Sequence, residues 1–229
     1  MISDKKRATL TGALFIFATA SAFVGDGFLG SILKAPDFLA LIFANQGRVA
    51  LAALFKIAAA AASAGIAMSM YPVLRRQDEG LALGSVCFRL VEGVFYLVGT
   101  LSLLTLLSLG QDYAKAGAET ASQFRVAGVL LLALQKWAGF VLGVIAFCLG
   151  ASMYYLVLFR TRLVPRWLSG WGLAALATLL VMVIFVMFGR EPSGMMLALA
   201  FPIFLQELVL AVWLIVKGFK RSAPDPDGK

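Results

Sequence analysis

Long apolar runs alternate with short polar connections along the whole chain. Six runs exceed the roughly 18 apolar residues that mark a membrane-spanning helix, and they cover residues 8–33, 49–74, 81–109, 126–159, 168–188 and 195–216. The first run continues through "FVGDGFLGSIL", which is too long for a signal-peptide core, so we expect it to be retained as a span. The pattern therefore predicts an all-α, polytopic membrane bundle of six transmembrane helices.

The same pattern divides the rest of the chain. Residues 1–219 are expected to form one transmembrane domain, and residues 220–229 a short polar tail inside the cell. The stretch Phe38–Ala44 is apolar but too short to cross a bilayer, so it either lies along the interface or folds back over the bundle. The fourth run is longer than a bilayer needs, which predicts that its outer end projects or tilts.

Composition supports the membrane class. The chain is 61% hydrophobic and 14% charged, whereas soluble domains have about 45–50% apolar and about 25% charged residues. The net charge of +8 does not indicate nucleic-acid binding, because the positive residues gather in the connections between apolar runs. The lipid bilayer is therefore the expected partner, nucleic acid is not, and a homo-oligomer is compatible with the pattern.

The distribution of Lys and Arg predicts orientation, because cytoplasmic loops are enriched in them. One side carries twelve: Lys5, Lys6, Arg7, Arg75, Arg76, Arg160, Arg162, Arg166, Lys217, Lys220, Arg221 and Lys229. The other side carries five: Lys34, Arg48, Lys115, Arg125 and Arg190. Both termini are therefore expected inside the cell. Trp167 and Trp171 follow the basic loop between the fourth and fifth spans, where an aromatic belt is expected.

The residue inventory offers little catalytic chemistry. The chain has no histidine and only two cysteines, Cys87 and Cys148, both within apolar runs. No Ser-His-Asp triad can be assembled, and no phosphate-binding glycine loop is present. We predict no catalytic residue, no cofactor and no metal site. An intramembrane enzyme is the least favoured class, although the sequence leaves enzymatic activity open.

Six charged residues lie inside the predicted spans: Asp26, Lys56, Arg89, Glu92, Lys136 and Glu207. A charge at the bilayer centre costs about 2.5–3.5 kcal/mol on insertion scales, so such residues normally pair or face water. A rise of about 1.5 Å per residue puts Arg89, Glu92 and Glu207 near the middle of the membrane. It puts the other three near the outer surface.

The three deep charges form a candidate network. Arg89 and Glu92 are three residues apart on one helical stripe, which also carries Tyr96, so they can pair directly. We expect Arg89 to lie between Glu92 and Glu207, because a guanidinium has donors enough for both carboxylates. The alternative is that Glu207 is protonated in hydrocarbon. Such a network either lines a cavity or holds the helices in register.

The three outer charges, Asp26, Lys56 and Lys136, either form the rim of an outward-opening cavity or extend to water individually. Lys136 shares a stripe with Gly139 and Gly143, a GxxxG pair that predicts close packing of another helix. The small residues of the second span suggest it as the packing partner. Pro202 predicts a kink in the sixth span, one turn before Glu207.

Three stretches, "FRLVEG" (88–93), "LFRTRLVPRWLSGWG" (158–172) and "QELVLAVWLIVKGF" (206–219), together with the six-span layout, resemble the bacterial membrane family known as domain of unknown function 4386. The resemblance covers nearly the whole chain, and Arg89 and Glu207 match two positions of its pattern. Many members have a histidine near the position of Lys136, where this sequence has none. The resemblance implies the fold and a multi-pass location in the bacterial cytoplasmic membrane, and no activity.

Two hypotheses about function follow. In the first, the charges line an outward-facing cavity that binds or moves a small polar or amphiphilic solute, whose identity the sequence does not give. In the second, the charges hold the bundle together in a non-catalytic membrane protein that acts through partners or lipids. The absence of an internal repeat counts against a standard secondary transporter.

Overall fold

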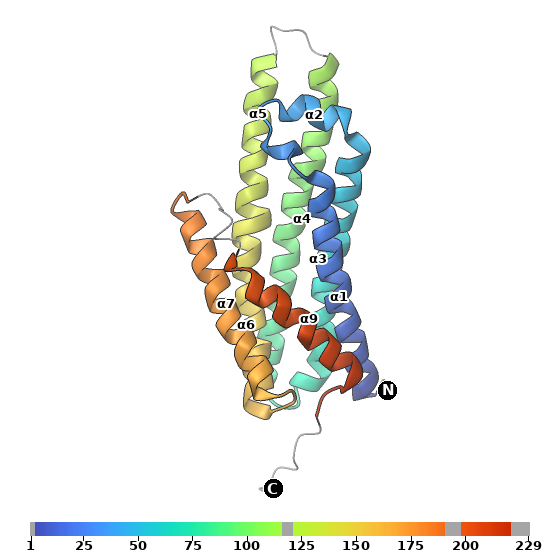
Figure 1. Cartoon of the computed structure of the whole chain (residues 1–229), viewed down its shortest axis with the longest axis vertical. Coiled ribbons are helices and arrows are strands. Elements are labelled where there is room, and N and C mark those ends of the chain that lie inside the picture. Colours follow the sequence, from blue (N-terminus) through green and yellow to red (C-terminus); the bar gives the residue numbers. More distant parts are fainter. Residues whose placement is uncertain (1–2, 116–120, 191–197, 221–229) are drawn as a thin grey trace, which may run out of the picture. The chain divides into compact units, whose positions relative to one another are not determined.

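The structure is a computed structural model that describes residues 3–115, 121–190 and 198–220, and all regular elements in these ranges are helical (Figure 1). Their bounds are α1 (Asp4–Leu29), η1 (Ile32–Lys34), α2 (Phe38–Ala44), α3 (Gln46–Leu74), α4 (Glu79–Lys115), α5 (Ala121–Leu134), η2 (Gln135–Leu142), α6 (Gly143–Thr161), α7 (Arg166–Met187) and α9 (Phe201–Val216). The predicted all-α class is confirmed for these residues.

Five helices of the described part of the chain are long and apolar enough to cross a membrane. They are α1, α3, α4, α7 and the 41-residue segment Ala121–Thr161, in which α5, η2 and α6 follow one another without a break. The predicted sixth span is represented by α9, which is apolar but only 16 residues long. These helices identify a multi-pass membrane protein, whereas the count of six and the orientation stay predictions.

The chain folds as two compact units. Unit 1 comprises Met1–Ile16, Ser63–Leu90 and Ile145–Lys229, and unit 2 comprises Phe17–Ala62 and Val91–Val144. The long helices α1, α3 and α4 each contribute residues to both units. The expectation of one domain over residues 1–219 stays a prediction, and nearly all of the predicted tail lies outside the described residues.

Unit 1 is held together by small residues and short polar contacts. A Cβ atom added at Gly12 of α1 would lie 2.5 Å from the backbone oxygen of Ala211 in α9, so these helices touch at their backbones. Thr11 and Ser69 share a buried hydroxyl–hydroxyl hydrogen bond of 2.7 Å between α1 and α3. Such close packing by small and hydroxyl residues is typical of membrane helices, where no hydrophobic effect drives association.

The aromatic residues expected after the basic loop lie on α7, in unit 1. The rings of Trp167 and Trp171, one helical turn apart on α7, stack with their centroids 6.4 Å apart. The guanidinium of Arg166 lies over the ring of Phe159, 5.5 Å from its centroid. Aromatic and basic side chains of this kind are enriched at membrane–water interfaces.

The short apolar stretch of unit 2 forms α2, whose bounds, Phe38–Ala44, match the predicted stretch. Ile42 is fully buried in a core cluster with Leu103 and Leu106 of α4. A Cβ atom added at Gly128 of α5 would lie 2.8 Å from the ring of Phe38. Of the two alternatives for this stretch, the structure shows the one in which it folds back over the bundle.

The predicted kink at Pro202 is wrong. Helix α9 begins at Phe201, so Pro202 occupies its first turn. A proline there disrupts nothing, because the backbone N–H groups of the first turn have no partner within the helix. Residues 191–197, which belong to or precede the predicted sixth span, lie outside the described residues.

Candidate functional site

Unit 2 contains a cavity of about 470 Å³. Its lining comes from α1, α3, α4, α5, η2 and the start of α6, and it combines polar and charged side chains with small and apolar ones: Ala22, Asp26, Lys56, Ala59, Tyr96, Gly99, Thr100, Leu132, Gln135, Lys136, Gly139, Phe140 and Val144. Ligand pockets in proteins occupy about 300–1,000 Å³. The cavity is therefore large enough for a small organic molecule.

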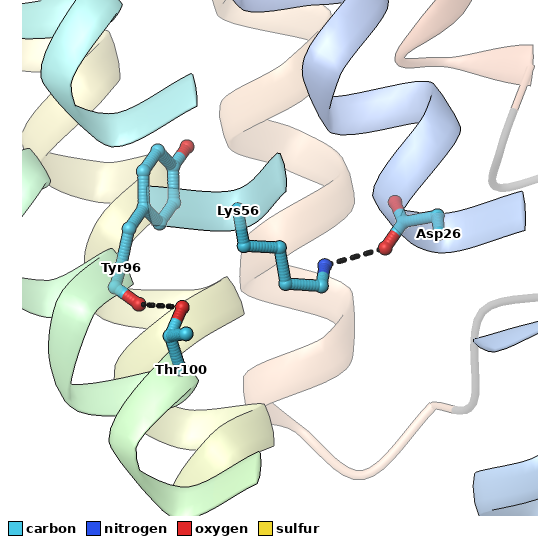
Figure 2. A network of polar contacts seen from close by, with 4 residues as sticks. All are labelled: Asp26, Lys56, Tyr96 and Thr100. Atoms are coloured by element: carbon cyan, nitrogen blue, oxygen red, sulfur yellow. Dashed lines mark hydrogen bonds and ion pairs between the residues drawn. The ribbon is translucent and has the colours of Figure 1, made fainter. Parts of the chain in front are cut away.

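Two of the outer charges form an ion pair across the cavity lining. The Lys56 ammonium on α3 donates a hydrogen bond to Asp26 Oδ1 on α1, with an N···O distance of 2.5 Å. Figure 2 shows the lysine side chain extended from its helix toward the carboxylate. The Lys56 side chain is 25% exposed and that of Asp26 is 69% exposed. The pair is thus open to exchange with water or with a solute.

Helix α4 supplies the aromatic and hydroxyl groups of the site. The Thr100 hydroxyl donates to the backbone oxygen of Tyr96 at 2.8 Å, one turn earlier on the same helix (Figure 2). A Cβ atom added at Gly143 would lie 2.5 Å from the Tyr96 ring. The glycine therefore makes room for the ring, which could not lie there against a larger residue.

A π-helix forms one wall of the cavity. Segment η2 adopts this wider helix over eight residues, Gln135–Leu142, and Gln135, Lys136, Gly139 and Phe140 all belong to the lining. π-Helices are rare and occur frequently at functional sites, because the extra residue per turn redirects side chains. In this chain the π-helix places Gln135 and Lys136 in the cavity lining.

The π-helix packs directly on α4. A Cβ atom added at Gly99 would lie 2.6 Å from the Cα atom of Gly139, so the two backbones are in contact. The two glycines of the predicted GxxxG pair, Gly139 and Gly143, therefore both face α4, through Gly99 and Tyr96. The second span was predicted as their partner, whereas the structure shows their nearest neighbours on α4, the third span. The sequence carries no signal that distinguishes the second span from the third.

The predicted outer charges, Asp26, Lys56 and Lys136, all line this one cavity. Two lysines against one aspartate leave an excess of one positive charge among the lining residues. Tyr96, Thr100 and Gln135 add groups that both donate and accept hydrogen bonds. This set suits the recognition of a small polar or charged molecule. Among the described residues, no group of three His, Cys, Asp or Glu side chains is placed to hold a metal ion.

The predicted deep charges are distributed over both units. Arg89, in unit 1, is 2% exposed, and its guanidinium lies over the Phe147 ring at 4.8 Å from the centroid. A Cβ atom at Gly150 would lie 3.1 Å from Arg89 Cγ, so α6 leaves room for the arginine stem. Glu92, in unit 2, is 2% exposed. The network predicted for Arg89, Glu92 and Glu207 stays a prediction.

Unit 1 holds a buried polar chain that the sequence did not reveal. The Tyr155 hydroxyl donates a short hydrogen bond to Gln206 Oε1, and Gln206 Nε2 donates to the backbone oxygen of Leu168 at 3.0 Å. Tyr155 and Gln206 are both fully buried. A glutamine beside Glu207 in an apolar run was the available signal, because a buried amide requires partners. Nothing in the sequence identified the partners.

Comparisons with known proteins give a family. The model of a domain of unknown function (DUF4386) matches residues 10–218, which is nearly the whole chain. No curated protein and no solved structure matches the chain.

Proposed function

Since the chain belongs to the DUF4386 family, a domain of unknown function, we propose its function from the geometry of unit 2. The chain is a multi-pass membrane protein whose cavity binds, and exchanges with the outer side, a small polar or amphiphilic solute. The observation that carries this proposal is the lining of one cavity of about 470 Å³ by Asp26, Lys56 and Lys136. Charges in a membrane segment are costly and mark solute pathways when they face a cavity.

The proposed topology has six spans with both termini in the cytoplasm of a bacterial cell. The excess of Lys and Arg in the connections of the predicted inner side supports it. In this orientation the N-terminal ends of α1 and α4 and the C-terminal end of α3 are cytoplasmic. Asp26 and Lys56 then lie about 28 Å above the inner anchors, which places the cavity toward the outer side.

Thiol labelling tests this proposal. Single cysteines at Ala22 and Ala59 would be introduced into a background that carries Cys87→Ala and Cys148→Ala, and intact cells would be treated with a membrane-impermeant thiol reagent. Both cavity positions are expected to react. Phe17 and Val94 are matched controls from the same unit, because they are apolar, 53% and 59% exposed, and absent from the cavity lining. Cysteines at these controls are expected to stay unlabelled in lipid.

Equal labelling at cavity and control positions, or labelling at neither, would contradict a water-filled cavity open to the outside. If the cavity positions are labelled in inverted vesicles but not in intact cells, the cavity is supported and the proposed orientation is reversed.

A structural role for the deep charges is the second candidate function. The burial of Arg89 and Glu92, each 2% exposed, favours it, because a buried charge contributes to a fold only where its surroundings compensate it. In this case Glu207→Gln reduces the yield of folded protein. In a transport role it abolishes solute movement and leaves the yield unchanged. Glu79→Gln, at an exposed position in the first turn of α4, is the control.

A further inference from the structure

We propose that the cavity of unit 2 selects an amphiphile with a monovalent anionic head, of the carboxylate class, and an apolar body. The inference rests on the proposed function and specifies its solute. It follows from three features of the lining: its charge, its hydrogen-bond donors, and the apolar residues that share it with them.

The charge of the lining favours an anion. Lys56 and Lys136 face one acidic residue, Asp26, among the lining residues. The excess among the lining residues is one positive charge, and charges near a protein surface interact more strongly than in bulk water. A monovalent anion balances the lining, whereas a cation adds to its excess.

The Lys56–Asp26 pair leaves Lys56 able to bind a second oxygen. An ammonium has three donor hydrogens, and the bond to Asp26 Oδ1 uses one of them. The Asp26 side chain is 69% exposed and therefore largely hydrated, so the pair contributes little stability. A ligand carboxylate can share the Lys56 ammonium with Asp26 or replace it.

The other donors of the lining come from α4 and the π-helix. Lys136 and Gln135 come from adjacent positions of η2, and Tyr96 comes from α4. An ammonium, an amide N–H₂ and a phenol all donate hydrogen bonds to a carboxylate, and those that involve a charge are the strongest. A π-helix at this wall is consistent with a binding role, because such segments recur at functional sites.

The rest of the lining includes apolar residues. Leu132, Phe140 and Val144 belong to it, together with Ala22 and Ala59. A fully hydrophilic anion would leave these residues without a complementary surface, and burying apolar ligand surface contributes about 25 cal/mol per Å². The ligand therefore has an apolar body of a size that fits about 470 Å³.

Three probes of equal chain length test the head group. Octanoate, octylammonium and octanol would be titrated into the full-length protein in nanodiscs of neutral lipid, with binding measured by calorimetry. Octanoate is expected to bind about tenfold tighter than either other probe, the effect of one charge-assisted hydrogen bond. Lys136→Met should weaken octanoate binding about tenfold, and Lys136→Arg, which keeps the charge, should retain most of it.

Lys34→Met is the control for general surface charge, because Lys34 is exposed on η1 and outside the cavity lining. It should leave octanoate binding unchanged. Asp26→Asn should strengthen octanoate binding severalfold, because it removes the competing carboxylate while keeping the shape of the side chain.

Several outcomes would overturn the inference. Octylammonium binding at least as tightly as octanoate would show the wrong charge preference. Equal losses in Lys34→Met and Lys136→Met would show binding at the surface. Absence of octanoate binding also overturns it. Thiol labelling at positions 22 and 59 then tests the proposed function separately. Labelling there would support a cavity that binds another solute, and no labelling would contradict the cavity itself.

Discussion

In unit 1, the Tyr155 hydroxyl, the Gln206 amide and the Leu168 carbonyl form a buried chain in which Tyr155 and Gln206 bond to one another. In unit 2, by contrast, Asp26, Lys56 and Lys136 line a cavity, and the Asp26 carboxylate is 69% exposed. Polar groups inside a membrane protein thus have two uses. Fully buried and mutually bonded groups fix the packing of helices, whereas partly exposed charges remain available to a solute.

The contrast predicts that stability and binding respond to different residues. Substitutions in the buried chain of unit 1 should lower the free energy of unfolding and leave the cavity chemistry of unit 2 intact. Substitutions of the lining charges should change solute binding and leave the free energy of unfolding nearly unchanged. The predictions below test this separation, from the largest expected change in stability to the smallest.

The largest effect is expected for Gly99→Ala in unit 2. The added methyl carbon would lie 2.6 Å from Gly139 Cα, and a backbone atom cannot move aside as a flexible side chain can. Overpacking of this kind costs about 1–3 kcal/mol, and we expect the upper end. Unfolding in mixed micelles of a non-ionic detergent and dodecyl sulfate would measure the change.

Gly27→Ala is the matched control, because nothing lies within 4 Å of a Cβ atom added there in α1. It should stabilise the protein by about 0.5–1 kcal/mol through the lower helix propensity of glycine. A loss at Gly27 as large as that at Gly99 would contradict the proposed backbone contact.

An intermediate effect is expected for Gln206→Leu in unit 1. The substitution removes the acceptor of the Tyr155 hydroxyl and the donor to the Leu168 oxygen. Each buried hydrogen bond contributes about 0.5–1.5 kcal/mol, so the loss of both should cost about 2 kcal/mol in the same unfolding assay. Octanoate affinity, corrected for the fraction folded, should not change.

Adding Tyr155→Phe to Gln206→Leu should recover part of the loss, because both hydrogen-bonding partners are then apolar. If the two substitutions are instead additive, the hydrogen bond between them contributes nothing to stability.

The smallest effect on stability is expected for Lys56→Met and Asp26→Asn. Partly exposed ion pairs contribute about 0–1 kcal/mol, and this pair includes a carboxylate that is 69% exposed. Either substitution should change the free energy of unfolding by less than about 0.5 kcal/mol. Octanoate binding should weaken with Lys56→Met and strengthen with Asp26→Asn. Large losses of stability in both variants would show that the Lys56–Asp26 pair holds helices together, as the buried chain of unit 1 does.

Apolar periodicity was sufficient to predict the helical class and the approximate position of most long helices. It also located α2, because the short apolar stretch Phe38–Ala44 is bounded by polar residues on both sides. Family-specific segments around Arg89, the basic loop and Glu207 indicated the family that the chain matches over residues 10–218. These features are local in sequence, which is why a single chain reveals them.

The cavity depends on features that are not local. The π-helix at Gln135–Leu142 and its contact with Gly99 arise from packing between helices, and no residue type in "QKWAGFVL" signals them. Likewise, Tyr155 and Gln206 are 51 residues apart. Depth estimates did place Asp26, Lys56 and Lys136 at a similar level, but helical rise alone does not reveal which faces of three helices meet.

The most direct test of the central claim is whether a solute protects the cavity. A single cysteine at Ala59, in the background without Cys87 and Cys148, would be labelled with an impermeant thiol reagent at increasing octanoate concentration. We predict that octanoate slows labelling at position 59 and that Lys136→Met abolishes this protection. Unchanged labelling, or equal slowing of labelling in detergent at the control position Val94, would contradict a solute site in unit 2.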